Sequence, residues 1–315
     1  MPLPLTARRV ADLLTGQVTD GAFVAGWSLV RVLPEPVAAA LFTAGADLAL
    51  IRGGPAFDRL RGNLARIAPD RDLDRLTRDA LRSYARYWRE VFRLPVTSAE
   101  RVEVGARTSH EERLFEAIEA GRGVICALPH SGNWDHAGAW LVGRGVRFTT
   151  VAERLRPEQL YDRFVAFREQ LGMEVLPLTG GRPPFEVLVD RLEDGGTLCL
   201  LSDRDLSARG VEVSFFGAAT RMPAGPASLA LRTGAVLLPV TLSFRPDGWD
   251  IAFHRPVPHT DVATMTQQLA DAFARGIASA PADWHMLQRL WLDDLDPDDP
   301  RRAALPAADR DAGGA

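Results

Sequence analysis

The stretch Val124-Ile-Cys-Ala-Leu-Pro-His-Ser-Gly-Asn-Trp-Asp135 decides the fold of this chain. Its opening apolar run is short and rich in β-forming residues, which predicts a buried strand. Pro129 cannot donate to a sheet ladder, so the strand is expected to end there. Asn133 is a good N-cap, which predicts a helix beginning at Trp134. His130 then lies just beyond the carboxyl edge of a sheet, where open α/β folds bind their ligands.

A histidine and an acid separated by four residues suggest acid–base chemistry in this turn. The turn is expected to fold Asp135 back towards His130, where a carboxylate would hold the imidazole in one tautomer. The other ring nitrogen would then be free to act as a base. The alternative is that Asp135 only complements the dipole of the helix.

Composition narrows the class of protein. A hydrophobic content of 46% and a charged content of 25% are ordinary for a globular chain, and the formal net charge of −4 argues against general nucleic-acid binding. Cys126 and Cys199 lie in apolar runs, which predicts buried thiols in a reducing compartment. The sequence shows no signal-peptide pattern and no run of the roughly 18–20 apolar residues that span a bilayer.

Residues 1–95 are expected to form an N-terminal helical region. Residues 22–30 and 37–51 are almost entirely apolar and predict two helices, and residues 70–93 predict an amphipathic helix rich in arginine. Two alternatives remain open for this region. In one, its helices pack against the body of the protein; in the other, they lie in a membrane interface, with arginines near anionic headgroups, and the two are compatible.

Residues 96–292 alternate between helical and strand patterns. Helices are expected at 111–120, from 134, and at 157–171, 184–194 and 262–277, with strands at 124–128, 146–152, 173–178 and 197–202. This rhythm predicts an α/β core with a central, mostly parallel sheet flanked by helices. Residues 235–244 and 249–254 predict a hairpin, which makes the sheet mixed. Residues 293–315 are acidic and rich in Asp, Pro and Ala, and predict a disordered tail.

A second predicted strand also ends in an acid, in Leu198-Cys-Leu-Leu-Ser-Asp-Arg-Asp205. If this strand neighbours the first, Asp203 emerges near His130. Further along, Gly225-Pro226 opens a predicted helix whose first main-chain amides suit an anion.

Several motifs together resemble a known family. His130-Ser-Gly-Asn-Trp-Asp135, Phe215-Phe216-Gly217 and Pro223-Ala-Gly-Pro-Ala227 resemble the bacterial lipid A lauroyl-type acyltransferases, which belong to the wider His-x4-Asp glycerolipid acyltransferases. Leu178-Thr-Gly-Gly-Arg-Pro-Pro-Phe-Glu186 and Asp203-Arg-Asp-Leu206 are most similar to the phosphatidylinositol mannoside acyltransferase branch. The resemblance extends over residues 5–292.

This resemblance implies an enzyme that transfers a palmitoyl-like chain from acyl-CoA, or from an acyl carrier protein, to a mannose hydroxyl of phosphatidylinositol mannoside. It implies a peripheral enzyme on the inner leaflet of the plasma membrane, at the cytoplasmic face, with neither metal nor cofactor. His130 would be the base, Asp135 the motif acid and Asp203 the acid that completes the relay. The remaining residues placed in the site by resemblance are Glu153, Arg168, Arg209 and Arg232, the last two near the expected CoA contacts.

The chemistry of the residues agrees with that expectation. Transfer from a thioester needs a base for the acceptor hydroxyl and donors for the tetrahedral oxyanion, for which the main-chain amides of residues 131–133 are candidates. Three alternatives remain: a different glycolipid acceptor, a non-catalytic lipid-binding protein, and a thioester or ester hydrolase. No Gly-x-Ser-x-Gly elbow stands out to favour a serine nucleophile.

Overall fold

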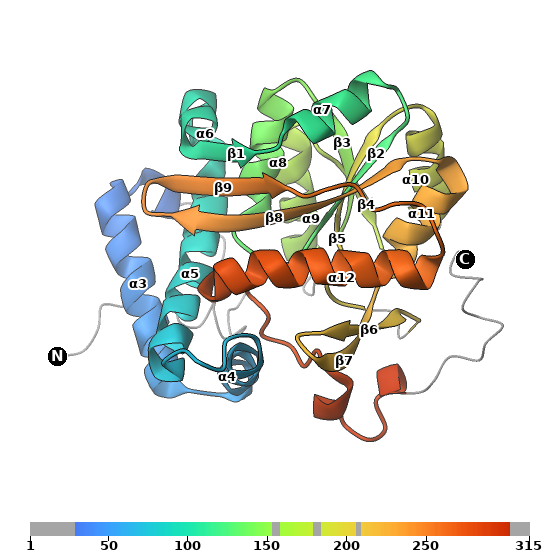
Figure 1. The fold of residues 1–315 in the computed structure, drawn as a ribbon. Helices are drawn as coiled ribbons and strands as arrows, with labels where there is room; N and C mark the ends of the chain where they lie inside the picture. Colours follow the sequence, from blue (N-terminus) through green and yellow to red (C-terminus); the bar gives the residue numbers. More distant parts are fainter. Residues whose placement is uncertain (1–28, 153–157, 179–183, 206–208, 303–315) are drawn as a thin grey trace.

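A seven-stranded mixed sheet forms the centre of the protein in the computed structural model, which describes residues 29–152, 158–178, 184–205 and 209–302 (Figure 1). The strand order is β1-β9-β8-β2-β5-β3-β4, and only the β8–β9 pair is antiparallel. The predicted α/β fold with a mixed, mostly parallel sheet is therefore confirmed. The strands are β1 (Ala106–Ser109), β2 (Val124–Leu128), β3 (Phe148–Ala152), β4 (Glu174–Pro177), β5 (Thr197–Leu201), β8 (Val236–Arg245) and β9 (Gly248–Phe253).

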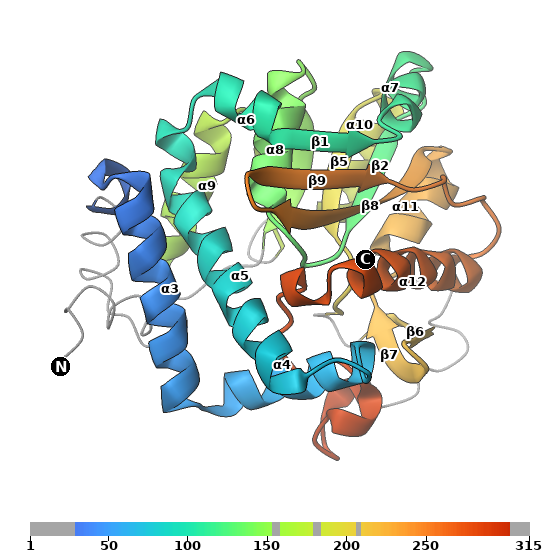
Figure 2. The ribbon, with the colours of Figure 1, turned by 60° about the vertical axis from the view of Figure 1, so that its left-hand side comes forward.

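Helices cover both faces of the sheet, because parallel neighbours must be joined by crossover connections. In Figure 2, α8 and α9 lie on one side of the strands, and α11 and α12 lie on the other. The helices of this part are α6 (Ala99–Gly105), α7 (Glu112–Glu119), α8 (Trp134–Gly143), α9 (Glu158–Gln170), α10 (Pro184–Glu193), α11 (Gly225–Thr233) and α12 (Val262–Ser279).

Within the described residues, the part of the chain before α6 contains α3 (Glu35–Arg52), α4 (Pro55–Ile67) and α5 (Leu73–Arg93). Helices α3 and α5 match the predictions over 37–51 and 70–93, whereas the helix predicted at 22–30 falls mostly outside the described residues. Within the described chain no single helix is long and apolar enough to cross a bilayer, although α3 and α4, bent by 94° at their junction, pass that test as a pair by length and composition.

The arginines of α5 largely bind within the protein. Arg82 pairs with Asp47 of α3 at 2.8 Å, and Arg93 pairs with Glu35 at 2.8 Å. Arg86 donates to the carbonyl oxygens of residues 245 and 248 at the β8–β9 turn. The later part of the polar face predicted for residues 70–93, at Arg86 and Arg93, is thus a contact surface within the protein, whereas Arg75 and Arg78 are exposed. Buried residues of α3, α4 and α5 belong to the same hydrophobic core as the sheet.

Glu90 ties α5 to the centre of the fold. Its buried carboxylate accepts hydrogen bonds from Arg86 at 2.6 Å, Asn133 at 2.9 Å and the indole of Trp249 at 2.7 Å. Burial acts to raise the pKa of Glu90, but attraction to His136 and Arg86 and these hydrogen bonds bring it below the usual value. Asn133 is the N-cap of α8, as predicted, so Glu90 also fixes the entry to that helix.

Some elements were not anticipated from the sequence. They are α4, α6, the edge strand β1 and a separate two-stranded hairpin of β6 (Val211–Phe215) and β7 (Ala218–Met222). At the other end, residues 293–302 were assigned to a disordered tail, but they contain 3-10 turns at Leu292–Asp294 and Pro300–Arg302, and Leu295 is buried. Residues 303–315 of the predicted tail lie outside the described residues.

Gly132 shapes the turn between β2 and α8. It adopts φ 58°, a region that favours glycine, and a Cβ at this position would lie 2.8 Å from the carbonyl carbon of Leu242 in β8. Its N–H donates to the carbonyl oxygen of Asp283 at 2.9 Å. The turn that carries His130 is therefore packed directly against two other segments of backbone.

Replacing Gly132 with alanine is expected to destabilise the protein by at least about 1–3 kcal/mol, because the variant adds positive-φ strain and a clash with backbone that cannot rotate away. The matched control is Gly143→Ala in the same helix–turn unit, where the added methyl meets open space. That control is expected to be neutral or to stabilise by about 0.4–1 kcal/mol. Urea unfolding of both variants checks this, and equal effects would contradict it.

Candidate active site

His130 and Asp203 emerge side by side from two neighbouring strands. Strands β2 and β5 are parallel with Leu128 opposite Leu201, and the N–H of Ser202 extends the ladder to Leu128 O at 2.7 Å. The next residues therefore leave the sheet at one place. The Nδ1 atom of His130 lies 2.5 Å from Oδ1 of Asp203, and the main-chain N–H of His130 donates to Oδ2 at 2.9 Å.

The environment of Asp203 fixes the tautomer of His130. Burial acts to raise the pKa of Asp203, but the charge of His130 and hydrogen bonds from His130 and Trp284 keep it below the usual value. An ionised carboxylate only accepts hydrogen bonds, so the proton of a neutral ring is on Nδ1 and the lone pair is on Nε2. The His130 side chain is 27% exposed, whereas Asp203 is fully buried. The Asp203 carboxylate contacts the ring directly, with no intervening residue.

The expected pairing of Asp135 with His130 is corrected by the structure. The Asp135 carboxylate accepts from Arg168 at 2.8 and 3.3 Å and from the hydroxyl of Tyr87 at 3.0 Å. Burial acts to lower the pKa of Arg168, but the charge and hydrogen bonds of Asp135 raise it above its usual value. Asp135 lies in the first turn of α8, and its side chain binds Tyr87 of α5 and Arg168 of α9 instead of His130.

The other residues placed in the site by resemblance have different surroundings. Arg168 and Arg209 both line the main cavity, the second together with Arg204. Arg232 lies on the exposed side of α11, where it forms a bidentate pair with Glu186 of α10 at 2.8 Å, and it does not line the cavity. Glu153 lies outside the described residues.

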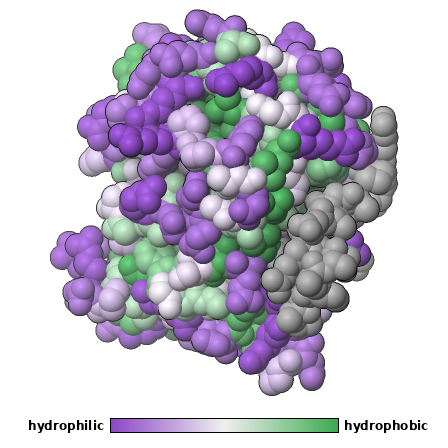
Figure 3. Space-filling view, turned by 45° about the vertical axis from the view of Figure 1, so that its right-hand side comes forward, coloured by the Kyte–Doolittle hydropathy of each residue, from purple (hydrophilic) through white to green (hydrophobic). Residues whose placement is uncertain are grey.

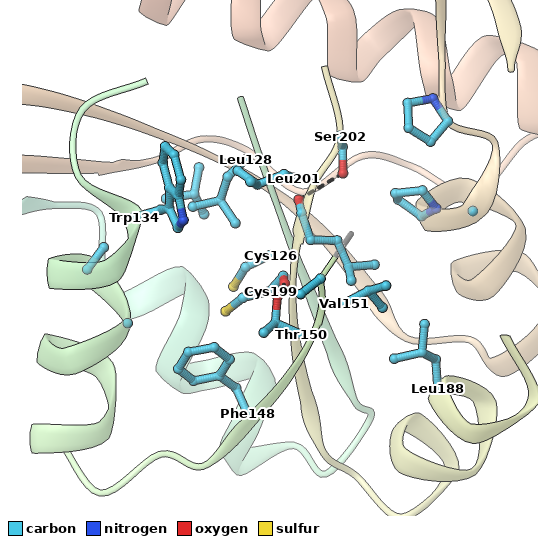
Figure 4. A pocket seen from close by; sticks show the side chains of 18 of the residues that line it. Cys126, Leu128, Trp134, Phe148, Thr150, Val151, Leu188, Cys199, Leu201 and Ser202 are labelled. Carbon is cyan, nitrogen blue, oxygen red and sulfur yellow. Dashed lines mark hydrogen bonds between the residues drawn. The ribbon is translucent and has the colours of Figure 1, made fainter. Parts of the chain in front are cut away.

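A cavity of about 810 Å³ begins at His130. Its lining is mainly apolar, and Figure 4 shows Cys126, Cys199, Phe148 and Thr150 pointing into the same space. Figure 3 shows that hydrophobic residues also gather in a band on one face of the surface, between hydrophilic margins. A ligand with a long apolar chain fits this lining better than a polar one.

The cavity reaches both faces of the sheet. Cys199 and Leu200 both line it, yet successive side chains of a strand point to opposite faces. On the Cys199 face the cavity is bounded by α8, through residues such as Ala137, and on the Leu200 face by α10, through Leu188. The space therefore passes around the carboxyl edge of β5, close to His130.

Two of the three main-chain amides predicted to hold an oxyanion are already engaged. The N–H of Ser131 donates to Pro129 O at 2.8 Å, and that of Gly132 donates to Asp283 O at 2.9 Å. The structure therefore gives no support for that role at residues 131 and 132. Within the described residues no group of three or more His, Cys, Asp or Glu side chains is placed to hold a metal ion.

Sequence reasoning missed Tyr87 and Trp284. Tyr87 donates to Asp135, and the indole N–H of Trp284 donates to Oδ2 of Asp203 at 2.9 Å. Each lies tens of residues from its acceptor, so no local spacing could reveal the contact. Long-range packing of α5 and of the segment after α12 brings them to the site.

We expect Asp135→Asn to lower the free energy of unfolding by about 3–5 kcal/mol, because it leaves the buried Arg168 guanidinium without its counter-charge. The matched control is Glu186→Gln, which breaks the exposed pair with Arg232 and is expected to cost about 0–1 kcal/mol. Chemical denaturation of the two variants measures the difference. An Asp135→Asn protein as stable as the wild type would show that the buried pair contributes little.

Comparisons with known proteins show the family of the chain. The family model described as bacterial lipid A biosynthesis acyltransferase matches residues 9–293. A phosphatidylinositol mannoside acyltransferase of Mycolicibacterium smegmatis is 55% identical over 298 residues, covering 93% of this chain and 97% of the relative. A protein of the same name from Mycobacterium tuberculosis H37Rv is 51% identical over 300 residues, covering 93% and 94%. The chain is therefore an acyltransferase that belongs to the bacterial lipid A biosynthesis acyltransferase family.

Proposed function

We propose that this enzyme transfers a palmitoyl-like chain from acyl-CoA to a mannose hydroxyl of phosphatidylinositol mannoside, at the cytoplasmic face of the plasma membrane. The observation that carries the proposal is the His130–Asp203 pair at an apolar cavity. The names of the relatives support the acceptor, because two proteins at 51–55% identity carry the name phosphatidylinositol mannoside acyltransferase.

In this mechanism His130 is the general base. Its Nε2 accepts the proton of the mannose hydroxyl while the hydroxyl oxygen attacks the thioester carbonyl, and Asp203 stabilises the imidazolium that forms. The tetrahedral intermediate collapses by breaking its carbon–sulfur bond, and the departing CoA thiolate takes the proton back from His130. The acyl chain passes directly between the two substrates, with no acyl-enzyme intermediate.

The cavity suggests how the donor binds. Its volume lies within the roughly 300–1,000 Å³ of small-molecule sites, and its apolar lining suits the acyl chain. Arg204 and Arg209 line it beyond the end of β5, and guanidinium groups bind phosphates by bidentate hydrogen bonds. We therefore assign the CoA phosphates to Arg204 and Arg209 in preference to Arg232, because Arg232 does not line the cavity.

The surface of α3 supports peripheral membrane binding. The helix is apolar around most of its circumference, and the exposed Val32, Val37 and Ile51 lie on it or just before it, Ile51 with 82% of its surface exposed. Exposed apolar side chains of this kind, with arginine close by at position 52, suit the interface of an anionic leaflet. In this proposal the inner leaflet delivers the glycolipid acceptor to the site.

The test is an assay of purified enzyme with labelled palmitoyl-CoA and phosphatidylinositol mannoside in vesicles. His130→Gln is expected to lower kcat by about 10²–10⁴-fold, the usual contribution of general-base catalysis. Asp203→Asn is expected to lower kcat as well, because it removes the charge that stabilises the imidazolium. Both variants should still bind the donor.

Other outcomes would reject the proposal in distinct ways. Transfer at the wild-type rate by His130→Gln would show that His130 is not the general base. Release of free fatty acid without acceptor would indicate a hydrolase, and binding without turnover would indicate a lipid-binding protein. Transfer only from acylated carrier protein would replace CoA as the donor.

A second prediction concerns the length of the acyl chain. Ala137→Phe places a ring in the cavity beside α8 and is expected to lower the preference for palmitoyl-CoA over a decanoyl donor by about tenfold or more. The matched control is Ala139→Phe in the same helix, because Ala139 is equally half-buried but does not line the cavity. Competition between the two donors measures the preference. An unchanged ratio in Ala137→Phe would place the acyl chain elsewhere.

A further inference from the structure

The segment that follows α12 closes around the His130 turn. It comprises a 3-10 turn, Pro281–Asp283, followed by Trp284 and His285. The main-chain N–H of His285 donates to the carbonyl oxygen of His130 at 2.8 Å, and the carbonyl of Asp283 accepts from the N–H of Gly132 at 2.9 Å. Residues 281–285 therefore hold the turn through two main-chain hydrogen bonds.

Trp284 extends this contact to the catalytic pair. Its indole N–H donates to Oδ2 of Asp203 at 2.9 Å, and both side chains are completely buried. The same oxygen accepts the main-chain N–H of His130 at 2.9 Å, which leaves Oδ1 to face Nδ1 of the ring. Two N–H donors on one oxygen thus determine which oxygen meets the imidazole.

We propose that Trp284 is a positioning residue for the acyl transfer, and that its indole N–H orients the Asp203 carboxylate towards His130. This inference rests on the proposed function, because it assumes that His130 is the base. Trp284 does not touch substrate in this scheme; it acts through Asp203 alone.

The surroundings of Trp284 make it a rigid donor. Its ring lies 6.0 Å from the centroids of both Phe215 and Trp291, at steep angles, so the indole is held from two sides. A carboxylate out of contact with water needs hydrogen bonds to remain ionised. Three N–H groups supply them here, and Trp284 is the donor that does not belong to His130.

Loss of that donor has a defined effect on acid–base behaviour. With one hydrogen bond fewer, the carboxylate attracts the proton of the pair more strongly. The His130–Asp203 pair then keeps its proton to a higher pH, so the form that can act as a base is reached only at a higher pH than in the wild type. The other charged or titratable groups around the pair remain in place in such a variant: Asp283, His285, Asp135, Arg168, Arg204, Asp205 and Arg209.

Trp284→Phe removes the N–H and keeps an aromatic ring. The chain offers a close control in Trp291→Phe, because Trp291 is also completely buried and also touches Phe215, but its indole donates to the main-chain oxygen of Phe215 at 3.0 Å. Both variants lose one buried indole donor and similar volume. Only Trp284→Phe removes a hydrogen-bond donor from Asp203, and Trp291→Phe keeps an aromatic ring against Trp284.

We expect Trp284→Phe to lower kcat about tenfold with little change in KM, and to shift the acid limb of the pH–rate profile to higher pH. Trp291→Phe should keep the wild-type profile, whatever it does to thermal stability. The inference is overturned if the two variants have the same profile, or if Trp284→Phe retains the wild-type kcat and profile.

A measurement on the wild-type protein needs neither variant nor substrate. In NMR spectra, the indole N–H signal of Trp284 should move with the same midpoint as the imidazole signals of His130, while that of Trp291 should not. A Trp284 indole signal that stays constant while the His130 signals titrate would overturn the inference. Failure of the wild-type enzyme to transfer an acyl chain would instead reject the proposed function, so the two failures are distinguishable.

Discussion

The register between β2 and β5 determines where the reactive groups of this acyltransferase lie. Because Leu128 stands opposite Leu201, the residues that follow each strand leave the sheet together, and His130 meets Asp203. A slip of one residue would turn the carboxylate to the other face of the sheet. Burying that carboxylate costs free energy, and the N–H groups of His130 and Trp284 offset the cost. Sheet pairing and the ionisation of Asp203 are thus parts of one arrangement.

Much of this arrangement could be predicted from the sequence, because it depends on local signals. The apolar run before Pro129 and the acid after a second buried strand located two strand ends, and the N-cap at Asn133 located the beginning of α8. The role of Asp135 could not be predicted in the same way. A spacing of five residues shows that two groups are near in the chain, but the packing of α5 and α9 decided that Asp135 would bind Tyr87 and Arg168.

The strand and the side-chain contacts that were not predicted from the sequence have one physical cause in common. Strand β1 has only four residues, and they alternate between half-buried and exposed. Its pairing with β9 therefore depends on neighbouring elements and not on its own hydrophobicity. Arg232 was placed near CoA by resemblance, whereas a glutamate on the adjacent helix binds its guanidinium. Arg82, Arg86 and Arg93 of α5 likewise bind carboxylates or carbonyl oxygens of other segments. In each case the partner is distant in the chain.

The contacts of Trp284 and His285 also bear on the order in which the protein matures. During translation Asp203 leaves the ribosome 81 residues before Trp284 does, and His130 leaves it earlier still. The nascent sheet can form its β2–β5 ladder at that stage, but the Asp203 carboxylate still lacks the hydrogen bond from the Trp284 indole. Docking of residues 281–285 then joins the late segment to the early helix α5, through the hydrogen bond from Ser83 to Asp283. Competence for chemistry is therefore acquired near the end of synthesis, after most of the scaffold exists.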